Sequence, residues 1–249
     1  MRRREMLAGI GMATLSGRAA LAAGPWLSPQ LPDGTRAIAR FGSAPGTTKL
    51  IELTDRPPNY EAPIGTFRTA ITPNDEFFIR YHLAEVPEMA ALASWKLTIG
   101  GDAATKETTL TLDDLKAMPA HEITAVCQCS GNRRGLFSPH VPGVEWGFGA
   151  MGCAVWRGPR LKDVLARAGV KDNALEVWMN GADSAPLPST PDFIKSLPTA
   201  KAMSDETIIA LTMNGAPLPW GNGYPARVVV PGWTATYWMK HVAKIDVMS

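Results

Sequence analysis

Apolar and polar residues alternate along several short stretches of the chain, and this period of two predicts β-strands with one buried face. The expected strands cover residues 76–83, 95–101, 175–180, 228–230 and 244–247. Residues 208–213 and 217–219 flank Asn214-Gly215, a dipeptide typical of a tight turn, and are expected to form a hairpin. Residues 123–126 are apolar and β-favouring, so we expect a buried strand there.

Helical spacing of apolar residues is limited to two short segments. Residues 110–118 would begin at the cap Thr111, and residues 160–169 would end at Gly169. Turns, short helical pieces or glycine-rich loops are expected over residues 144–147, 149–152, 191–197 and 201–207. Together these elements predict an α+β fold in which β-structure dominates.

The composition is that of a globular protein and gives no sign of a nucleic-acid partner. The 249 residues are 45% hydrophobic and 19% charged, which excludes bulk disorder. The formal charge of +2 comes from the first 22 residues, which hold four Arg and one Glu. The remainder has 21 basic and 22 acidic residues, so it has no basic excess for nucleic acid or an anionic membrane.

The first 22 residues have the pattern of an export signal. A basic head is followed by an apolar run to Leu15, which is too short to span a membrane. Ala20-Leu21-Ala22 follows and fits a cleavage site. Arg3-Arg4-x-Met6-Leu7 matches the twin-arginine form, whose machinery exports folded proteins. We therefore expect a periplasmic protein; the alternative is a general secretory signal with a rich basic head. The Pro- and Gly-rich residues 23–66 are expected to form an irregular arm.

Candidate chemistry centres on Cys129, at the end of the expected strand over residues 123–126. Gly131 allows a sharp turn there, and Arg133 and Arg134 follow. Nearby positive charge favours a thiolate, which binds soft metals, and guanidinium groups can hold an oxyanion beside it. The segment therefore predicts one metal-ligating thiolate in an anion-binding pocket; the alternative is a buried cysteine with surface arginines. Cys127 is too close along the strand to form an unstrained disulfide with Cys129.

Five further motifs occur in a fixed order along the chain. They are Phe-x-Arg-x-His at 78–82, Gln-Cys-Ser-Gly-Asn-Arg-Arg at 128–134, Gly-Val-Glu-Trp-Gly at 143–147, Met-Asn-Gly at 213–215 and Tyr-Pro-Ala-Arg-Val-Val-Val-Pro-Gly at 224–232. In this combination the chain resembles the sulfite oxidase family of molybdopterin enzymes from about Thr72 to Val247. The resemblance is greatest to haem-free, periplasmic bacterial members. It implies a β-rich sulfite-oxidase-like domain over residues 67–249, without the C-terminal dimerisation domain of many relatives.

The resemblance also assigns roles to individual residues. Cys129 is implied to bind molybdenum, beside the dithiolene of a single pterin, and Arg80 and Arg134 are implied to line the oxyanion pocket as catalytic residues. The implied cofactor-binding residues are Phe78, Ile79, Arg80, Tyr81, His82, Cys129, Asp183, Asn222, Arg227, Trp238, Met239 and Lys240. Cys127 does not match the ligand position and is expected to be a small core residue.

The function implied is oxidation of sulfite to sulfate by oxygen-atom transfer, with electrons passed to an external c-type cytochrome. One alternative is a reductase of the same superfamily that acts on S-oxides such as methionine sulfoxide. Another is a non-catalytic, pterin-binding module. Retention of Cys129 with two arginines argues against the module, and two arginines favour a small anion over a neutral sulfoxide. The sequence predicts no particular oligomeric state.

Two positions depart from the family pattern. Animal enzymes have a tyrosine near the metal where this chain has Phe193, and a histidine where it has Asn222. A phenylalanine cannot donate a hydrogen bond to the substrate. Either Tyr224, Tyr237 or another residue supplies that donor, or sulfite turnover is impaired.

Overall fold

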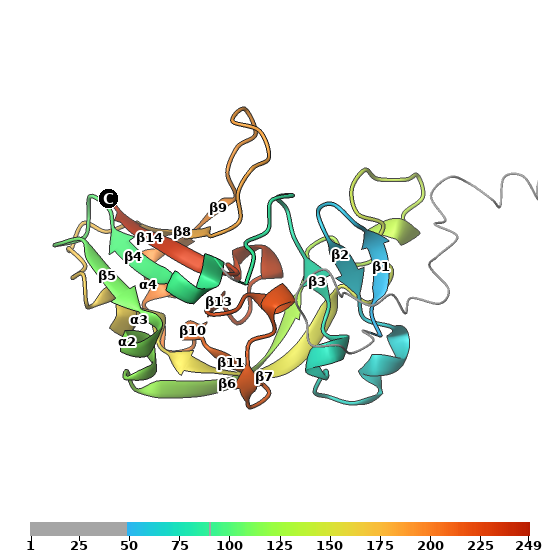
Figure 1. The fold of residues 1–249 in the computed structure, drawn as a ribbon, viewed down its shortest axis with the longest axis horizontal. Helices are drawn as coiled ribbons and strands as arrows, with labels where there is room; N and C mark the ends of the chain where they lie inside the picture. The colour runs from blue at the N-terminus through green and yellow to red at the C-terminus, as the bar shows by residue number, and fades with distance from the viewer. Residues whose placement is uncertain (1–48, 90) are drawn as a thin grey trace, which may run out of the picture. The chain divides into compact units, whose positions relative to one another are not determined.

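Antiparallel pairing joins most strands of the described residues, 49–89 and 91–249, into four sheets in this computed structural model (Figure 1). The strands are β1 (Ile51–Thr54), β2 (Asn59–Glu61), β3 (Ile79–Arg80), β4 (Lys96–Gly100), β5 (Thr108–Thr111), β6 (Ala120–Gln128), β7 (Met151–Pro159), β8 (Glu176–Gly181), β9 (Ile194–Pro198), β10 (Ile208–Ala210), β11 (Thr212–Met213), β12 (Ala216–Pro217), β13 (Arg227–Val229) and β14 (Val242–Met248). The α-helices are α2 (Leu112–Lys116), α3 (Leu161–Leu165) and α4 (Thr199–Ala202). The fold is the β-rich α+β type that the sequence predicts. The expected export signal and residues 23–48 of the expected arm lie outside the described residues.

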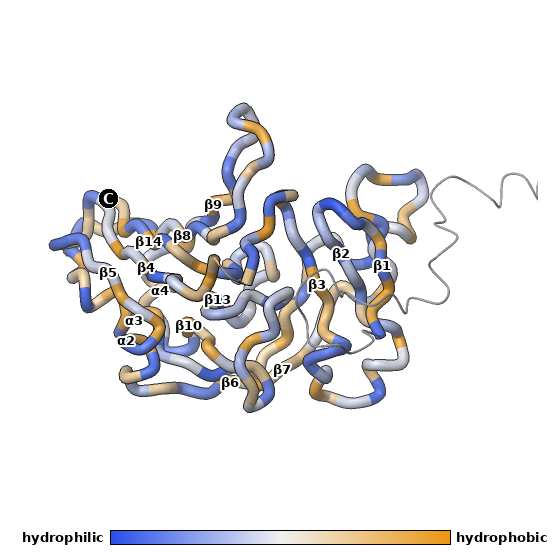
Figure 2. The backbone as a smooth tube through the Cα atoms, viewed as in Figure 1, coloured by the Kyte–Doolittle hydropathy of each residue, from blue (hydrophilic) through white to orange (hydrophobic). Residues whose placement is uncertain are grey.

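The largest sheet has the strand order β5-β4-β14-β8-β9. β14 lies at its centre and pairs parallel to β4 and antiparallel to β8. Hydropathy changes repeatedly along these strands (Figure 2), as expected for strands with one buried face. The predicted strands over 95–101, 175–180 and 244–247 are therefore confirmed. Residues 191–197 were expected to be helical or turn pieces, and this is wrong, because Ile194–Pro198 pairs with β8 as an edge strand.

A second sheet has the order β12-β11-β7-β6 and carries Cys129 just beyond the end of β6. The nine residue pairs between β6 and β7 make this the longest ladder described here. The prediction of a buried strand over 123–126 is right about the strand and wrong about its burial. β6 has only one neighbour, and Val126 is 47% exposed. The predicted loop over 149–152 is wrong in its second half, because β7 begins at Met151.

The first described strands correct another prediction. β1, β2 and β3 form a small sheet with its own cluster of buried side chains, comprising Leu50, Tyr60, Ala62, Ile79 and Tyr81. Residues 51–61 are therefore not an irregular arm. Their apolar pattern is short and is interrupted by Pro and Asp residues, so it does not stand out as a strand signal. A boundary at residue 66 would cut through this sheet, since β2 pairs with β3. The strand expected over 76–83 is reduced to Ile79–Arg80.

Both predicted helices are present but short. Thr111 caps α2 with a reciprocal capping box, because its hydroxyl accepts from the Asp114 backbone N–H while the Asp114 carboxylate accepts from the Thr111 N–H. α3 is followed by Gly169, whose φ of +74° ends the helical run as expected. None of the helices within residues 49–89 and 91–249 has the length and apolar character needed to cross a membrane.

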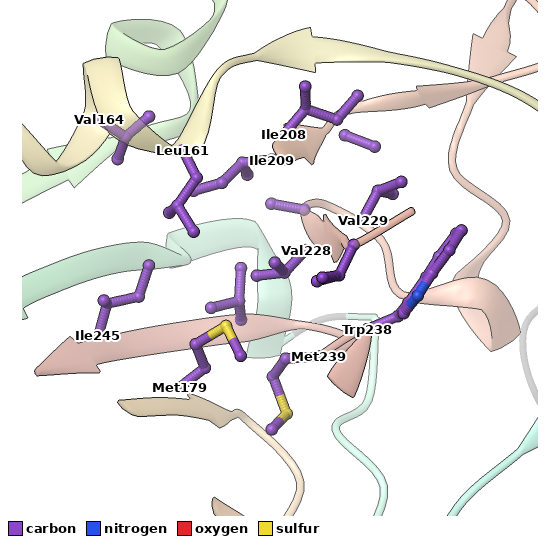
Figure 3. Packing of buried hydrophobic residues seen from close by; sticks show 14 of the residues in the cluster. Leu161, Val164, Met179, Ile208, Ile209, Val228, Val229, Trp238, Met239 and Ile245 are labelled. Carbon is purple, nitrogen blue, oxygen red and sulfur yellow. The ribbon is translucent and has the colours of Figure 1, made fainter. Parts of the chain in front are cut away.

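One hydrophobic core joins the larger sheets to the cavity described below. Side chains of α3, β8, β10, β13 and β14 converge there, and Trp238 and Met239 belong to the same cluster (Figure 3). Trp238 is 1% exposed and Met239 is 2% exposed. Burial of such side chains stabilises the fold by about 1.5–3 kcal/mol each. The segment that precedes Lys240 is therefore fixed by the core.

Asn214 fixes the predicted hairpin by two independent features. Its φ of +53° and the φ of +78° at Gly215 form the left-handed turn between β11 and β12. Its side-chain oxygen accepts from the Val155 backbone N–H at 2.9 Å, and its amide donates to the Thr72 carbonyl oxygen at 2.9 Å. The turn thus connects β7 to the segment that leads into β3.

We expect Asn214→Ala to lower the free energy of unfolding by about 2–4 kcal/mol, because it leaves buried partners unsatisfied and strains a left-handed residue. Gly215→Ala is the matched control. No atom lies within 4 Å of an added Cβ at Gly215, so only backbone strain of about 1–2 kcal/mol applies. Urea unfolding of both variants measures the difference. Equal losses would show that the Asn214 side-chain bonds do not stabilise the hairpin.

Candidate active site

One cavity gathers most of the residues to which the sequence assigns chemistry. The space between its walls is about 560 Å³, a volume that includes open solvent. The lining residues are Phe78, Arg80, Tyr81, His82, Cys129, Asp183, Phe193, Gly221, Asn222, Arg227, Ala235, Thr236, Trp238, Met239 and Lys240. They come from segments far apart in the chain, so the cavity exists only in the folded protein.

Cys129 is held at the cavity by the tight loop after β6. Its backbone N–H donates to the Ala150 carbonyl oxygen at 2.9 Å, and its own carbonyl accepts from Asn132 N–H at 3.0 Å. The Gly131 N–H points to its Sγ at 3.4 Å. The Asn132 side chain closes the loop by accepting from Ala150 N–H at 3.1 Å. The thiol is only 8% exposed, so the backbone fixes its direction and the cavity is its main opening.

Arg227 is a buried cation with an incomplete set of partners. Its guanidinium donates to the Asn222 carbonyl oxygen and to the Cys127 Sγ, both at 3.2 Å. It also lies 5.4 Å from the ring centroid of Trp156 and 5.8 Å from that of Trp238. The Nε atom is buried and has no hydrogen-bond partner among the described residues. Cys127 is therefore more than a small core residue, because its sulfur orients this guanidinium.

Lys240 is held by an aromatic ring. Its Nζ lies 2.9 Å from the ring centroid of Tyr81 and donates to the Gly221 carbonyl oxygen at 3.1 Å. Burial is the main cause that lowers the pKa of Lys240 well below its ordinary value, and the Arg227 charge adds to this, while Asp183 opposes it. Bringing an anion into the cavity would favour the charged ammonium.

His241 holds Tyr81 in place. The Tyr81 hydroxyl lies 2.8 Å from Nε2 of His241, whose Nδ1 lies 2.6 Å from the Tyr224 carbonyl oxygen. Because a carbonyl only accepts, Nδ1 carries the proton and Nε2 accepts from Tyr81. Burial and the nearby Lys240 charge lower the pKa of His241 to about 3. The imidazole is therefore neutral at physiological pH. The hydrogen bond between His241 and the Tyr81 hydroxyl holds the tyrosine ring against Lys240.

Arg80 lies beside the Cys129 thiol, and its charge also acts on His82. Burial lowers the pKa of its guanidinium, while the Cys129 sulfur beside it acts in the opposite direction. Its guanidinium donates to the Asn59 side-chain oxygen at 3.2 Å and to the Tyr81 carbonyl oxygen. Arg80 is thus oriented by acceptors that leave its positive charge uncompensated.

His82 and Phe193 form the aromatic wall. Their rings stack with centroids 3.9 Å apart, and the Lys195 Nζ lies 4.9 Å from the Phe193 centroid. Phe193 thus occupies a place in the lining, as the sequence suggests. The wall presents an aromatic face and no hydroxyl.

The cavity fits an anionic group that also carries a soft metal. Arg80, Arg227 and Lys240 all line it, and no carboxylate in residues 49–89 and 91–249 forms an ion pair with any of them. Burying an uncompensated cation is costly, so a bound anion would relieve the cost. The Nε atom of Arg227 supplies a donor without an acceptor. The Cys129 thiol adds the ligand type that molybdenum requires in the predicted cofactor.

Two predicted site residues do not line the cavity. Ile79 is buried behind its wall, where its Cδ1 would lie 2.6 Å from a Cβ on Gly221. Arg134 packs against Gly131 and Gly143 and points to the Val144 carbonyl oxygen at 3.4 Å. Its charge still reaches Arg80, whose pKa it helps to lower. A direct contact between Arg134 and substrate stays a prediction.

The sequence analysis missed three lining residues, Gly221, Ala235 and Thr236. Gly221 precedes Asn222, and its lack of a side chain makes room for Ile79. Ala235 and Thr236 lie in a 3-10 helix (η7, Ala235–Tyr237) directly before the predicted Trp238 to Lys240 segment. Their position beside that segment is the only signal in the sequence that points to them.

A family model described as "Oxidoreductase molybdopterin binding domain" matches residues 83–249. Mitochondrial sulfite oxidase from Mus musculus is 41% identical over 72% of this chain and 33% of its own length. Its counterpart from Drosophila melanogaster is 40% identical over 77% of this chain and 34% of its own length. A nitrate reductase [NADH] from Hordeum vulgare is 35% identical over 80% of this chain and 23% of its own length.

Among solved structures, the sulfane dehydrogenase SoxCD from Paracoccus pantotrophus superposes with a TM-score of 0.70 and 27% sequence identity. The match covers 89% of this chain and 57% of that chain. The present chain therefore spans about a third of the length of the sulfite oxidases and rather more than half of the SoxCD chain.

The neutral state of His241 predicts a pH-dependent stability. The folded chain takes up this proton only near pH 3, whereas the unfolded chain takes it up below the ordinary pKa of 6.5. Between these values the unfolded state binds more protons, so the free energy of unfolding falls as the pH falls. The contribution of one histidine is about 1.4 kcal/mol per pH unit within this window.

We expect His241→Asn to remove that contribution, because Asn does not titrate and tolerates the φ of +48° at this position. The measurement is urea unfolding of both proteins at several pH values from about 7 to about 4. The difference in stability between the proteins should shrink as the pH falls. A difference that stays constant across the range would show that His241 is not held neutral in the fold.

Proposed function

Because this chain belongs to the oxidoreductase molybdopterin-binding domain family, we propose that it oxidises sulfite to sulfate and passes the electrons to an external c-type cytochrome. The observation that carries the proposal is a buried cysteine, Cys129, in a cavity lined by Arg80, Arg227 and Lys240, none of which forms an ion pair with a carboxylate in residues 49–89 and 91–249. Identity of about 40% with mitochondrial sulfite oxidases supports the substrate. The cytochrome acceptor and the periplasmic location rest on the sequence alone.

Different parts of the cavity would hold different parts of the cofactor. Cys129 would bind the metal, and Arg227 and Lys240 would neutralise the negative charge of the pterin group. The Asp183 carboxyl lines the cavity, and its oxygens can accept hydrogen bonds from a polar heterocycle. When bound, the molybdenum–pterin cofactor supplies oxygen-atom transfer and the two-electron redox change.

The protein's own contribution is electrostatic and geometric. Arg80 is oriented by Asn59 and Tyr81 before substrate arrives, so attracting a dianion requires little rearrangement. The stacked rings of His82 and Phe193 line one side of the site. Preorganised charge strengthens the interaction between a small oxyanion and the cavity.

A second candidate function is oxidation of a sulfane sulfur. The superposition on the sulfane dehydrogenase SoxCD favours it, and so does the aromatic face of Phe193, which suits a larger and softer sulfur substituent. The cations fit either substrate, because both are anions. Thiosulfate is a convenient probe for this candidate.

We expect the purified, molybdenum-loaded protein to reduce cytochrome c when sulfite is added. Cys129→Ser should lower this rate by on the order of 100-fold or more, because loss of a direct ligand should exceed the 10–100-fold cost of losing an outer partner. Cys153→Ser is the matched control, since Cys153 does not line the cavity and its hydrogen bonds with Thr72 involve only the backbone atoms of Cys153. The control should keep its rate and its metal content.

The outcomes separate the candidates. Loaded protein that responds to thiosulfate and not to sulfite would replace sulfite by a sulfane substrate. Loaded protein that is silent with both and instead reduces methionine sulfoxide would identify a reductase. Protein that binds the pterin without turnover of any of these substrates would indicate a non-catalytic module.

A further inference from the structure

Thr236 brings a hydroxyl group to the cavity lining, and its hydrogen-bond partner, Ser130, is not a lining residue. Phe193 lines the cavity without a hydroxyl and stacks on His82. The Tyr81 hydroxyl lines the cavity but is bound to His241 at 2.8 Å. Neither Tyr224 nor Tyr237 is among the described residues that line it. Thr236 is left as the hydroxyl that can face a ligand.

Thr236 is connected to the loop that carries the thiol. Its Oγ1 lies 3.3 Å from the Oγ of Ser130, the residue that follows Cys129. Ser130 is exposed and Thr236 is half-buried, so the pair lies at the rim of the cavity. A hydroxyl has one donor and two acceptor positions. When Ser130 donates to Thr236, the proton of Thr236 is free for a third group.

The backbone around Thr236 is rigid enough for recognition. In η7 the Trp238 N–H donates to the Ala235 carbonyl oxygen at 3.1 Å, and the Trp238 indole N–H donates to the Trp233 carbonyl oxygen at 3.0 Å. The rings of Trp233 and Tyr237 meet edge to face with centroids 4.7 Å apart. Since Trp238 is fixed in the core, the hydroxyl beside it is positioned before any ligand binds.

We propose that Thr236, paired with Ser130, donates a hydrogen bond to an oxygen of the substrate anion and so supplies the donor that Phe193 lacks. This proposal rests on the proposed function, because it assumes a sulfur oxyanion in the cavity. The charge of Arg80 attracts the anion, and the directional bond from Thr236 selects an oxygen-bearing ligand. Thr236 acts on binding of the anion, so its loss should raise KM more than it lowers kcat.

The experiment compares three variants of the molybdenum-loaded protein. Thr236→Val removes the hydroxyl and keeps the shape, and Thr236→Ser keeps the hydroxyl. Thr234→Val is the matched control, because Thr234 is exposed, is two residues away and does not line the cavity. The measurements are KM and kcat for sulfite, and binding of radiolabelled sulfate by equilibrium dialysis without an electron acceptor. Metal content and thermal melting verify that each variant is loaded and folded.

We expect Thr236→Val to raise KM and to weaken sulfate binding, each by about 10-fold, the effect of one hydrogen bond to a charged group. Thr236→Ser and Thr234→Val should stay within about twofold of the unmodified protein. Equal behaviour of Thr236→Val and Thr234→Val in the dialysis would overturn the proposal. Protein that binds sulfate but does not oxidise sulfite would refute the proposed function, and the dialysis would still decide the role of Thr236.

Discussion

Uncompensated positive charge in a confined cavity is the constraint on which the site depends. Arg227 is buried and Lys240 is partly buried, and neither forms an ion pair with a described carboxylate, which on its own is unfavourable, although the Asp183 charge acts on Lys240. The fold tolerates them because aromatic faces and carbonyl oxygens surround them. Tyr81 contacts the ammonium, and Trp156 and Trp238 flank the guanidinium. These partners carry no full negative charge, so an anion bound in the cavity would interact with Arg227 and would favour the charged form of Lys240, whose pKa is lowered by burial.

The same constraint explains how the core and the site are joined. The segment before Lys240 is anchored by Trp238 and Met239 in the hydrophobic core, and the loop of Cys129 is anchored by backbone bonds to the start of β7. The groups that would hold the cofactor are therefore fixed from two sides. A site assembled from distant segments needs this rigidity, because displacement of a charged group by about 1 Å weakens its interaction sharply.

The sequence predicted β4, β8 and β14 of the large sheet, the capped helix and the hairpin because each has a local signal, such as the alternation in β4 or the turn at Asn214. It failed where the signal depends on partners. β9 has no clear period of its own and is a strand because it pairs with β8. The burial of β6 was overestimated because an apolar sequence cannot reveal that the strand has one neighbour.

Arg80, Cys129, Arg227 and Lys240, which the motifs singled out, line one cavity, and their roles toward cofactor and substrate stay predictions. Two features were out of reach. Lys240 and His241 are adjacent in sequence, yet both contact Tyr81, because the left-handed backbone at His241 turns the chain. The alternation of a strand places adjacent residues on opposite faces, so it does not predict that Lys240 and His241 contact the same ring. The pairing of Thr236 with Ser130 joins residues that are more than a hundred positions apart, and only the fold brings them together.

The position of Arg227 beside two indole rings has an optical consequence. The emission of tryptophan responds to the electric field at its ring, and the guanidinium lies close to the rings of both Trp156 and Trp238. An anion that binds to Arg227 changes that field. Because both indoles are buried, their emission is shielded from changes in bulk solvent. The cavity thus contains its own reporter of whether it is filled, with no need for a chemical label.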